Sequence, residues 1–393
     1  MRGGLREFMG FPRADGRVGV RNHVLILPVS PAANRAALIA QQAVPAAAVV
    51  QVAQEIGPDV AGWELAVRVI AGWVDHPNVY AAVLVAVERD DPVVRRVMAD
   101  MRGEVRCQTV TLAEAGGTRA AAEMIQVAVA RWQRAAAQET RLPVPLSQLL
   151  LGTECGGSDA CSGLSANPSL GWASDHLIAA GGTSILAETT ELIGAEMLLA
   201  TRARSQAVAD RLLDTVRSAE HAAMRMGADF RGAQPAPGNM AGGLSTIEEK
   251  SLGCIHKGGR SSLSAVVEYA QRPPASGLVV MDTPGHDVMQ LVGMVAGGAQ
   301  VVVFTTGRGT PTGSAIAPVI KVSTRTELFR SLGRHIDLDA GPVIDGYLTV
   351  DQVGEQLLRK IVAVANGERV AAERLGHREF GIFQGWTDAG GVD

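Results

Sequence analysis

The stretch Val79-Tyr-Ala-Ala-Val-Leu-Val-Ala-Val87 decides the fold class. This unbroken apolar run predicts a strand. A polar turn over residues 88–91 follows it, and then a pattern over 91–102 that predicts a helix. The same alternation of short apolar runs and longer helical patterns recurs on both sides of this stretch. Strands that alternate with helices imply βαβ units, so we predict an α/β fold with mainly parallel sheets.

The alternation extends over the whole chain. Further strands are predicted at 23–28, 46–52, 105–110, 147–151, 183–187, 277–282, 299–304 and 317–322. Further helices are predicted at 32–43, 62–75, 117–138, 168–180, 190–203, 205–227, 246–253, 261–270, 286–296, 324–332 and 349–366. Residues 229–244 are rich in Pro and Gly without periodicity, which is typical of a long functional loop.

We expect two domains, because 393 residues exceed the usual size of one. The segment Arg141-Leu-Pro-Val-Pro-Leu146 carries two prolines and marks the predicted boundary. The prediction is thus two doubly wound α/β domains, residues 1–143 and residues 144–393. We expect the second domain to carry most of the functional site.

Composition excludes several classes of protein. The net charge is −4, which argues against binding driven by neutralisation of nucleic-acid phosphates. No apolar stretch is long enough to span a membrane, and the first residues lack the apolar region of a secretory signal. Four cysteines in 393 residues, without a C-x-x-C pair, are no disulfide framework. We therefore expect a cytoplasmic protein with reduced thiols and neither nucleic acid nor membrane as a partner.

Lysine is rare, with four among 36 basic residues: Lys250, Lys257, Lys321 and Lys360. This matters because Lys, unlike Arg, readily loses its proton. Lys321 is a single charge in an apolar strand, so it either reaches solvent or is buried with a lowered pKa. Lys257 lies where a helix stops at glycines, a place that favours any cation. Lys250 lies in the first turn of a helix, which is mildly unfavourable for a cation.

Polar residues gather at the ends of four predicted strands in the second half. These are residues 152–159, Glu188 with Glu191, residues 282–285 and residues 305–310. In open α/β sheets, ligands bind at the carboxyl ends of the strands. The convergence therefore predicts a binding or catalytic site at this edge.

Several of these residues also have a structural interpretation. Cys155 is either a small buried hydrophobe or part of a site. Arg308 either grips a carboxylate or is a solvated loop cation. The residues from Ser245 to Glu248 fit a capping box, which would make Glu248 structural.

Five blocks of the chain resemble the altronate/galactarate dehydratase family, whose relatives include the large subunit of sulfolactate sulfo-lyase. The blocks are Phe11 to Leu25, Glu154 to Pro168, Pro237 to Gly253, Met281 to Gly285 with 296–299 and 304–309, and Gly376 to Phe380. Their order and spacing span nearly the whole chain.

The resemblance implies a lyase that removes water from a sugar acid and gives a 2-keto-3-deoxy acid. It also implies a divalent metal, iron(II) or manganese(II), and a small-molecule hydroxy acid as substrate. Elimination needs a base for the α-proton, an acid for the leaving hydroxyl and a cation for the developing enediolate. On this basis we assign three groups of candidates. The catalytic candidates are Lys250, Lys257, Lys321, Glu154 and Asp159. The substrate-binding candidates are Ser158, Asn167, Asn239, Thr305, Thr306 and Arg308. The metal-ligand candidates are Cys155, Glu188 and Asp282.

The chain also departs from the family pattern. Only about ten residues precede the first block, where many relatives carry a small domain, so we expect a separate small subunit or a homo-oligomer. The cysteines typical of the first half are absent, and Met240 stands where relatives often have Lys. Two alternatives follow: a sulfo-lyase large subunit that releases sulfite from sulfolactate, and a catalytically weakened binding subunit.

Overall fold

The first unit is built on a four-stranded, all-parallel sheet with the strand order β4-β3-β5-β6. A computed structural model describes residues 6–101 and 106–385 of the chain. The strands are β3 (His23–Pro28), β4 (Ala48–Val49), β5 (Val79–Ala86) and β6 (Cys107–Thr111). Every residue of β5 is buried, as its unbroken apolar sequence predicts. Residues 102 and 105, at the edges of two predicted elements, lie outside the described residues.

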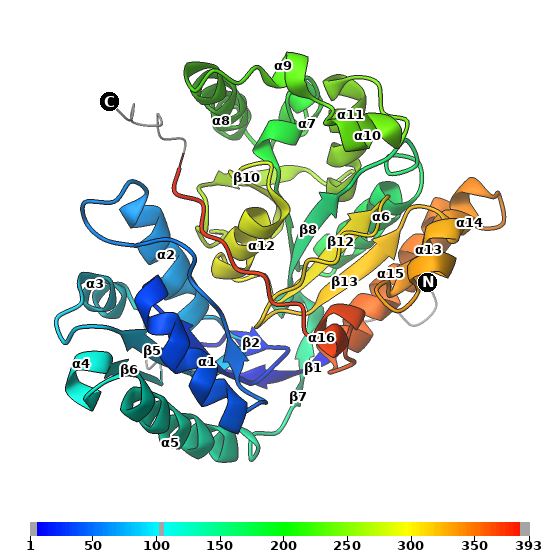
Figure 1. The fold of residues 1–393 in the computed structure, drawn as a ribbon. Helices are drawn as coiled ribbons and strands as arrows, with labels where there is room; N and C mark the ends of the chain where they lie inside the picture. The colour runs from blue at the N-terminus through cyan, green and yellow to red at the C-terminus, as the bar shows by residue number, and fades with distance from the viewer. Residues whose placement is uncertain (1–5, 102–105, 386–393) are drawn as a thin grey trace.

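Helices cover both faces of this sheet (Figure 1). Side chains of α1 (Asn34–Ala43) and α5 (Thr118–Ala136) pack in one apolar cluster with one set of alternating strand residues. Those of α2 (Trp63–Val74) and α3 (Pro92–Asp100) pack in another cluster with the other set. The unit is therefore doubly wound, as predicted.

The second unit is built on a seven-stranded, all-parallel sheet with the strand order β10-β11-β9-β8-β12-β13-β14. The strands are β8 (Leu150–Gly156), β9 (Thr183–Leu186), β10 (Leu263–Val267), β11 (Gly277–Met281), β12 (Val301–Thr306), β13 (Val319–Ser323) and β14 (Leu338–Asp339). Strands β8, β9 and β12 lie at the middle of the sheet, so the polar ends predicted for them meet at one edge.

Helices also cover both faces of the larger sheet (Figure 1). The principal helices are α6 (Ala166–Ala179), α8 (Gln206–Arg225), α11 (Ile247–Ile255), α12 (Asp287–Ala296) and α15 (Val350–Ala365). Gly152 of β8 faces α12, because a Cβ added there would lie 3.2 Å from the sulfur of Met294. Residues at even positions near the end of β8 therefore share the α12 face, and those at odd positions share the opposite face.

Shorter elements complete the chain. The small antiparallel sheet β2-β1-β7 contains β1 (Glu7–Pro12), β2 (Val18–Gly19) and β7 (Leu142–Pro145). Strand β7 lies within the proline-containing segment that we predicted as the domain boundary. The remaining helices are α4 (Leu112–Ala115), α7 (Glu196–Ala200), α9 (Phe230–Ala233), α10 (Pro237–Ala241), α13 (Thr326–Leu332), α14 (Gly341–Ile344), α16 (Ala371–Leu375) and the 3-10 turns η1 (Pro31–Ala33), η2 (Leu146–Gln148), η3 (Thr189–Glu191) and η4 (His256–Gly258).

Several local predictions were wrong. The predicted helix at 261–270 is the edge strand β10, whose backbone pairs with β11 and overrides the helical spacing of its apolar residues. The predicted helix at 190–203 shrinks to α7, because Gly194 adopts a φ of 89° and interrupts it. The predicted strand at 46–52 keeps only the two residues of β4. The segment 229–244, predicted as a loop, contains the short helices α9 and α10.

The two units pack against each other through α2 and α12. The indole of Trp73 donates a hydrogen bond to the carbonyl of Val292 (3.1 Å). Gly72 is needed at this contact, since a Cβ there would lie 2.4 Å from the carbonyl oxygen of Ala296. The C-terminal segment after α16, red in Figure 1, crosses between the two units. Within the described residues, no helix is long and apolar enough to cross a membrane.

Candidate active site

The end of β8 divides the candidate site between the two faces of the sheet. Cys155 follows Glu154 directly, so the two side chains point to opposite faces. Both residues belong to the strand rather than to the loop after it, because β8 begins and ends later than predicted.

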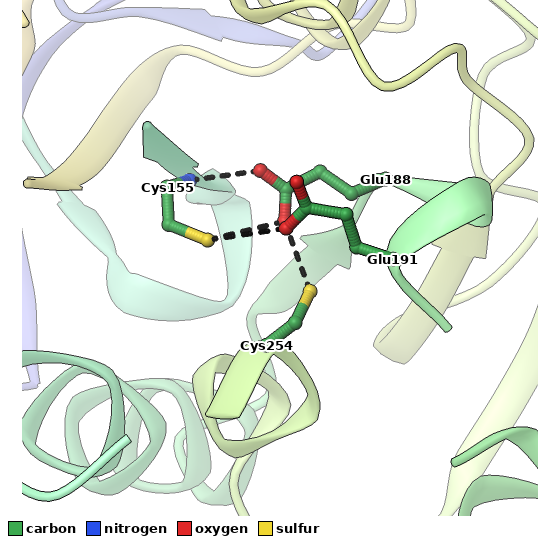
Figure 2. Close-up of side chains that lie close together, drawn as sticks. All are labelled: Cys155, Glu188, Glu191 and Cys254. Carbon is green, nitrogen blue, oxygen red and sulfur yellow. Dashed lines mark hydrogen bonds between the residues drawn. The ribbon is translucent and has the colours of Figure 1, made fainter. Parts of the chain in front are cut away.

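Four side chains converge on the face of Cys155: those of Cys155, Glu188, Glu191 and Cys254 (Figure 2). Their nearest ligand atoms all lie within 4.8 Å of one another. The Cys254 thiol donates to Oε2 of Glu188 at 2.9 Å, and the Cys155 thiol donates to the same oxygen at 3.3 Å. The backbone N–H of Cys155 donates to Oε1 of Glu188 at 3.1 Å. Glu188 is therefore the centre of this metal-ligand group, the name used below for these four residues.

The backbone holds Glu188 in an uncommon conformation. Its φ is 74°, a left-handed value that a residue with a side chain seldom adopts and that is concentrated at functional sites. The N–H of Glu188 donates to the hydroxyl of Thr283 (2.7 Å), and the hydroxyl of Thr189 donates to Asp282 (2.8 Å). Asp282, a predicted metal ligand, thus lies outside the metal-ligand group and holds the turn that presents Glu188.

Cys254 enters the site from α11, the helix after the long loop. Thr246 caps this helix by accepting from the N–H of Glu249 (3.2 Å), and Glu249 accepts from the N–H of Ser245 (2.7 Å). The predicted capping box of Ser245 and Glu248 is therefore wrong: Thr246 is the N-cap, and the glutamate that bonds back toward the helix start is Glu249, which accepts from Ser245. The other end of the helix is held by Asn167, whose amide donates to the carbonyl of Gly253 (2.9 Å).

Two of the predicted lysines form ion pairs with the metal-ligand group. Lys257 is fully buried, contacts Glu188 directly and lies 3.0 Å from the sulfur of Cys155. Lys250 pairs with Glu191 at 2.8 Å. Burial alone would lower the pKa of each lysine, but the neighbouring acidic groups outweigh it and raise the pKa of both. Both lysines are therefore held in the charged form.

The carboxyl groups respond differently to this environment. Burial would raise the pKa of Glu188, but the Lys257 ammonium and the hydrogen bonds from Cys254 and Lys257 hold it below its ordinary value. Burial, together with the charge of Glu188, raises the pKa of Glu191. Burial also raises the pKa of the Cys254 thiol well above its usual range.

The α12 face carries a second buried polar cluster. Glu154, Phe304 and Lys321 are register partners on neighbouring parallel strands, so their side chains share this face. The Nζ of Lys321 lies 3.5 Å from the centre of the Phe304 ring. The Asp287 carboxylate lies against Gly156, where a Cβ would be 2.3 Å from Oδ2. Burial and then the charge of Glu188 raise the pKa of Glu154 well above its usual range, and burial raises the pKa of Asp287.

A cavity of about 230 Å³ is connected to the metal-ligand group through Lys250, which lines the cavity and pairs with Glu191. Its lining includes Ser158, Asp159, Asn167, Lys250 and His256. Four of these five residues were predicted site residues, and the cavity has room for a small polar molecule. Burial lowers the pKa of His256, which favours a neutral imidazole there.

Several of the predicted catalytic and substrate-binding groups already have partners within the protein. Both oxygens of Asp159 are engaged, by Ser162 (3.1 Å) and by Thr324 (2.9 Å) among others. The hydroxyl of Thr305 donates to Asn167 (2.6 Å). The hydroxyl of Thr306 accepts from the N–H of Gly309 (2.9 Å). These contacts fix the loops that surround the cavity.

The two remaining candidates lie at the loop that carries α10. The amide of Asn239 donates to the carbonyl of Ser158 (2.9 Å), which joins the loop to the end of β8. Arg308 is exposed and packs on Gly238, where a Cβ would be 1.9 Å from its Nη1. Arg308 is thus placed to meet a molecule from solvent.

Sequence reasoning placed Glu191 at the functional edge without assigning it as a metal ligand, and it missed Cys254 and His256 as site residues. Glu191 follows Glu188 by three residues, a spacing that brings both to one side of a turn. Cys254 and His256 lie three residues and one residue before Lys257, one of four lysines in the chain. The rarity of that lysine was the available signal.

The metal-ligand group fits a divalent ion by number and kind of donors. Two thiols and two carboxylates make a four-ligand set, and thiolates suit iron(II) or zinc more than manganese(II), which prefers oxygen. Lys257 already contacts two of the donors, Cys155 and Glu188. An ion bound here would therefore compete with the Lys257 ammonium.

A doubly wound α/β fold with paired acids, lysines and thiols at the carboxyl edge of its sheet is typical of an enzyme. Comparison with known proteins gives the same class. Residues 146–387 match the family described as "D-galactarate/Altronate dehydratase, C-terminal". Residues 10–137 match "D-galactarate dehydratase/Altronate hydrolase, second domain".

Individual relatives agree with this match. The chain is 32% identical to the altronate dehydratase of Bacillus subtilis (strain 168) over 389 residues, which cover 96% of this chain and 78% of the relative. It is 34% identical to the (2R)-sulfolactate sulfo-lyase subunit beta of Chromohalobacter salexigens over 390 residues, which cover 95% of this chain and 96% of the relative. It is 41% identical to the galactarate dehydratase (L-threo-forming) of Escherichia coli (strain K12) over 248 residues, which cover 63% of this chain and 47% of the relative. The chain belongs to the galactarate/altronate dehydratase family and is a hydro-lyase.

Proposed function

We propose that the chain dehydrates a sugar acid of the altronate or galactarate type to a 2-keto-3-deoxy acid. The observation that carries the proposal is the metal-ligand group, whose ion-pair partner Lys250 lines a cavity, in a chain of this family. The presence of the group argues against a weakened binding subunit. A cytoplasmic location and a small partner subunit stay predictions from sequence.

The metal-ligand group would hold iron(II) or manganese(II), and its thiols favour iron(II). Such an ion, when bound, supplies positive charge that stabilises the negative charge developing on the substrate as its α-proton leaves. The protein's own residues bind and orient the substrate. Lys250 lines the cavity as an ammonium and would hold the substrate carboxylate. Asp159 and Asn167 keep the loops around it in place.

One observation favours a second candidate, release of sulfite from sulfolactate. The match covers 96% of the sulfo-lyase subunit but 78% of the Bacillus altronate dehydratase. Loss of sulfite also begins with removal of an α-proton, so the same residues would serve it.

The direct test is a substrate panel with anaerobically purified protein and added iron(II) or manganese(II). We expect altronate, galactarate or a related aldonate or aldarate to give a 2-keto-3-deoxy acid, measured as its semicarbazone. Glu188→Gln should abolish this product, while Cys161→Ser, outside the metal-ligand group, should preserve it. Sulfite from sulfolactate would select the second candidate. No product from any of these acids would overturn both.

A further inference from the structure

Two ionisable side chains on the α12 face are buried without hydrogen-bond partners. Neither carboxyl oxygen of Glu154 has one among the described residues, and neither does the Nζ of Lys321. Glu154 is fully buried and Lys321 is 1% exposed. Leaving such groups unpaired in a protein interior is costly, and an apolar side chain would fill the same space more stably. Unsatisfied groups of this kind are concentrated at functional sites.

The surroundings of Lys321 differ from those of the other two site lysines. Lys250 and Lys257 are each bonded to a carboxylate and stay charged. Lys321 instead rests on the ring of Phe304, an arrangement that orients Nζ without giving it a counter-ion. Among the three, Lys321 is the lysine whose lone pair can be free at neutral pH.

We infer that Lys321 is the catalytic base of the elimination, a role that rests on the proposed function. Its neutral Nζ takes the proton from C2 of the hydroxy acid. The C–H electron pair forms the C2–C3 double bond as the C3–O bond breaks. The ammonium so formed gives the same proton to the departing hydroxyl, so water leaves and the amine is restored. The enol product then tautomerises to the 2-keto acid.

The charged groups around Lys321 set its titration. Burial lowers its pKa to about 7, against the opposing effect of Asp287 on α12, Glu154 on β8, Glu379 in the C-terminal segment and Asp337 before β14. The amine is therefore partly neutral near pH 7, and the active form gains population as the pH rises.

The C-terminal segment, residues 376–385, contributes one of the charges that act on Lys321. It has neither helix nor strand, and Glu379 in it accepts a hydrogen bond from the N–H of Gly313 (2.8 Å). The negative charge of Glu379 is one of those that oppose the effect of burial on the pKa of Lys321.

The test compares Lys321→Met and Lys321→Arg with the control Lys360→Met. Lys360 lies on α15, and its ammonium pairs with the exposed carboxylate of Glu368. We expect both Lys321 variants to lose about 10²–10⁴-fold in kcat, because neither side chain can act as a neutral base. Lys360→Met should keep wild-type activity. The wild-type kcat/KM should rise with pH through an ionisation near 7.

A second measurement does not depend on elimination. A 3-deoxy analogue without the leaving hydroxyl should exchange its C2 proton with D₂O in wild type, followed by NMR, and Lys321→Met should lose the exchange. Activity of Lys321→Arg within threefold of wild type would overturn the base role, and so would a flat wild-type pH profile. If Lys321→Met fails to fold, the pH profile decides. Absence of any lyase activity in wild type would instead contradict the proposed function.

Discussion

The charge state of each lysine in the site follows from what lies next to its ammonium. Lys257 lies among Cys155, Cys254 and Glu188, so it is a permanent cation in the interior. Lys250 is likewise held as a cation by its ion pair with Glu191. Lys321 lacks such a bonded carboxylate among the described residues. One residue type thus supplies two fixed charges and one group that exchanges protons near neutral pH.

Removal of Lys257 should reveal how strongly the site depends on it. In Lys257→Met, Glu188 would stay buried without its counter-ion, which typically costs about 3–5 kcal/mol in the free energy of unfolding. Urea unfolding in the presence of a chelator measures this. Lys360→Met, which breaks an exposed pair, should cost less than about 1 kcal/mol. Equal stabilities of Lys257→Met and wild type would show that the pair is not formed.

At the scale of elements, the sequence predicts the parts that depend on local pattern. The buried strands and their polar carboxyl ends follow from apolar runs such as residues 79–87 and 299–304, and parallel strands bring such ends together without further information. The place of Glu188 in the site was predictable for this reason.

Other parts depend on contacts that no local pattern contains. The pairing of β10 with β11 turns a helical pattern into a strand. Glu191 joins the site because Glu188 turns the chain into η3, and Cys254 joins because α11 ends there. For Lys321 the pattern left two alternatives, and only the packing of α12 over the sheet distinguishes burial from exposure.

At the scale of the whole molecule, the two units meet along a buried surface that includes a histidine. The Nε2 of His76 donates to the carbonyl of Ala299 in the second unit (3.2 Å), while Nδ1 accepts from the N–H of Asn78 (3.0 Å). This pattern requires a neutral ring. Burial accordingly lowers the pKa of His76 to about 3.

Acidification should therefore weaken the contact between the units. The unfolded chain binds a proton at His76 below about pH 6.5, whereas the folded chain does not until about pH 3. Between these values the stability contributed by His76 is lost at up to about 1.4 kcal/mol per pH unit as the pH falls. Urea unfolding across pH 4–7 should show that the free energy of unfolding falls more steeply with decreasing pH in wild type than in His76→Gln. His221→Gln, on a more exposed helix position, should follow wild type, and equal slopes for all three would exclude the effect.

Metal content of the anaerobically purified protein tests the central claim most directly, namely that Cys155, Glu188, Glu191 and Cys254 form the metal centre of a hydro-lyase. Elemental analysis after loading with iron(II) should give about one ion per chain in wild type and in the control Cys107→Ser. Glu188→Gln and Cys254→Ser should retain less than about a tenth of it, with dehydration activity falling in parallel. Wild-type protein without bound metal, or full occupancy in both variants, would contradict the claim.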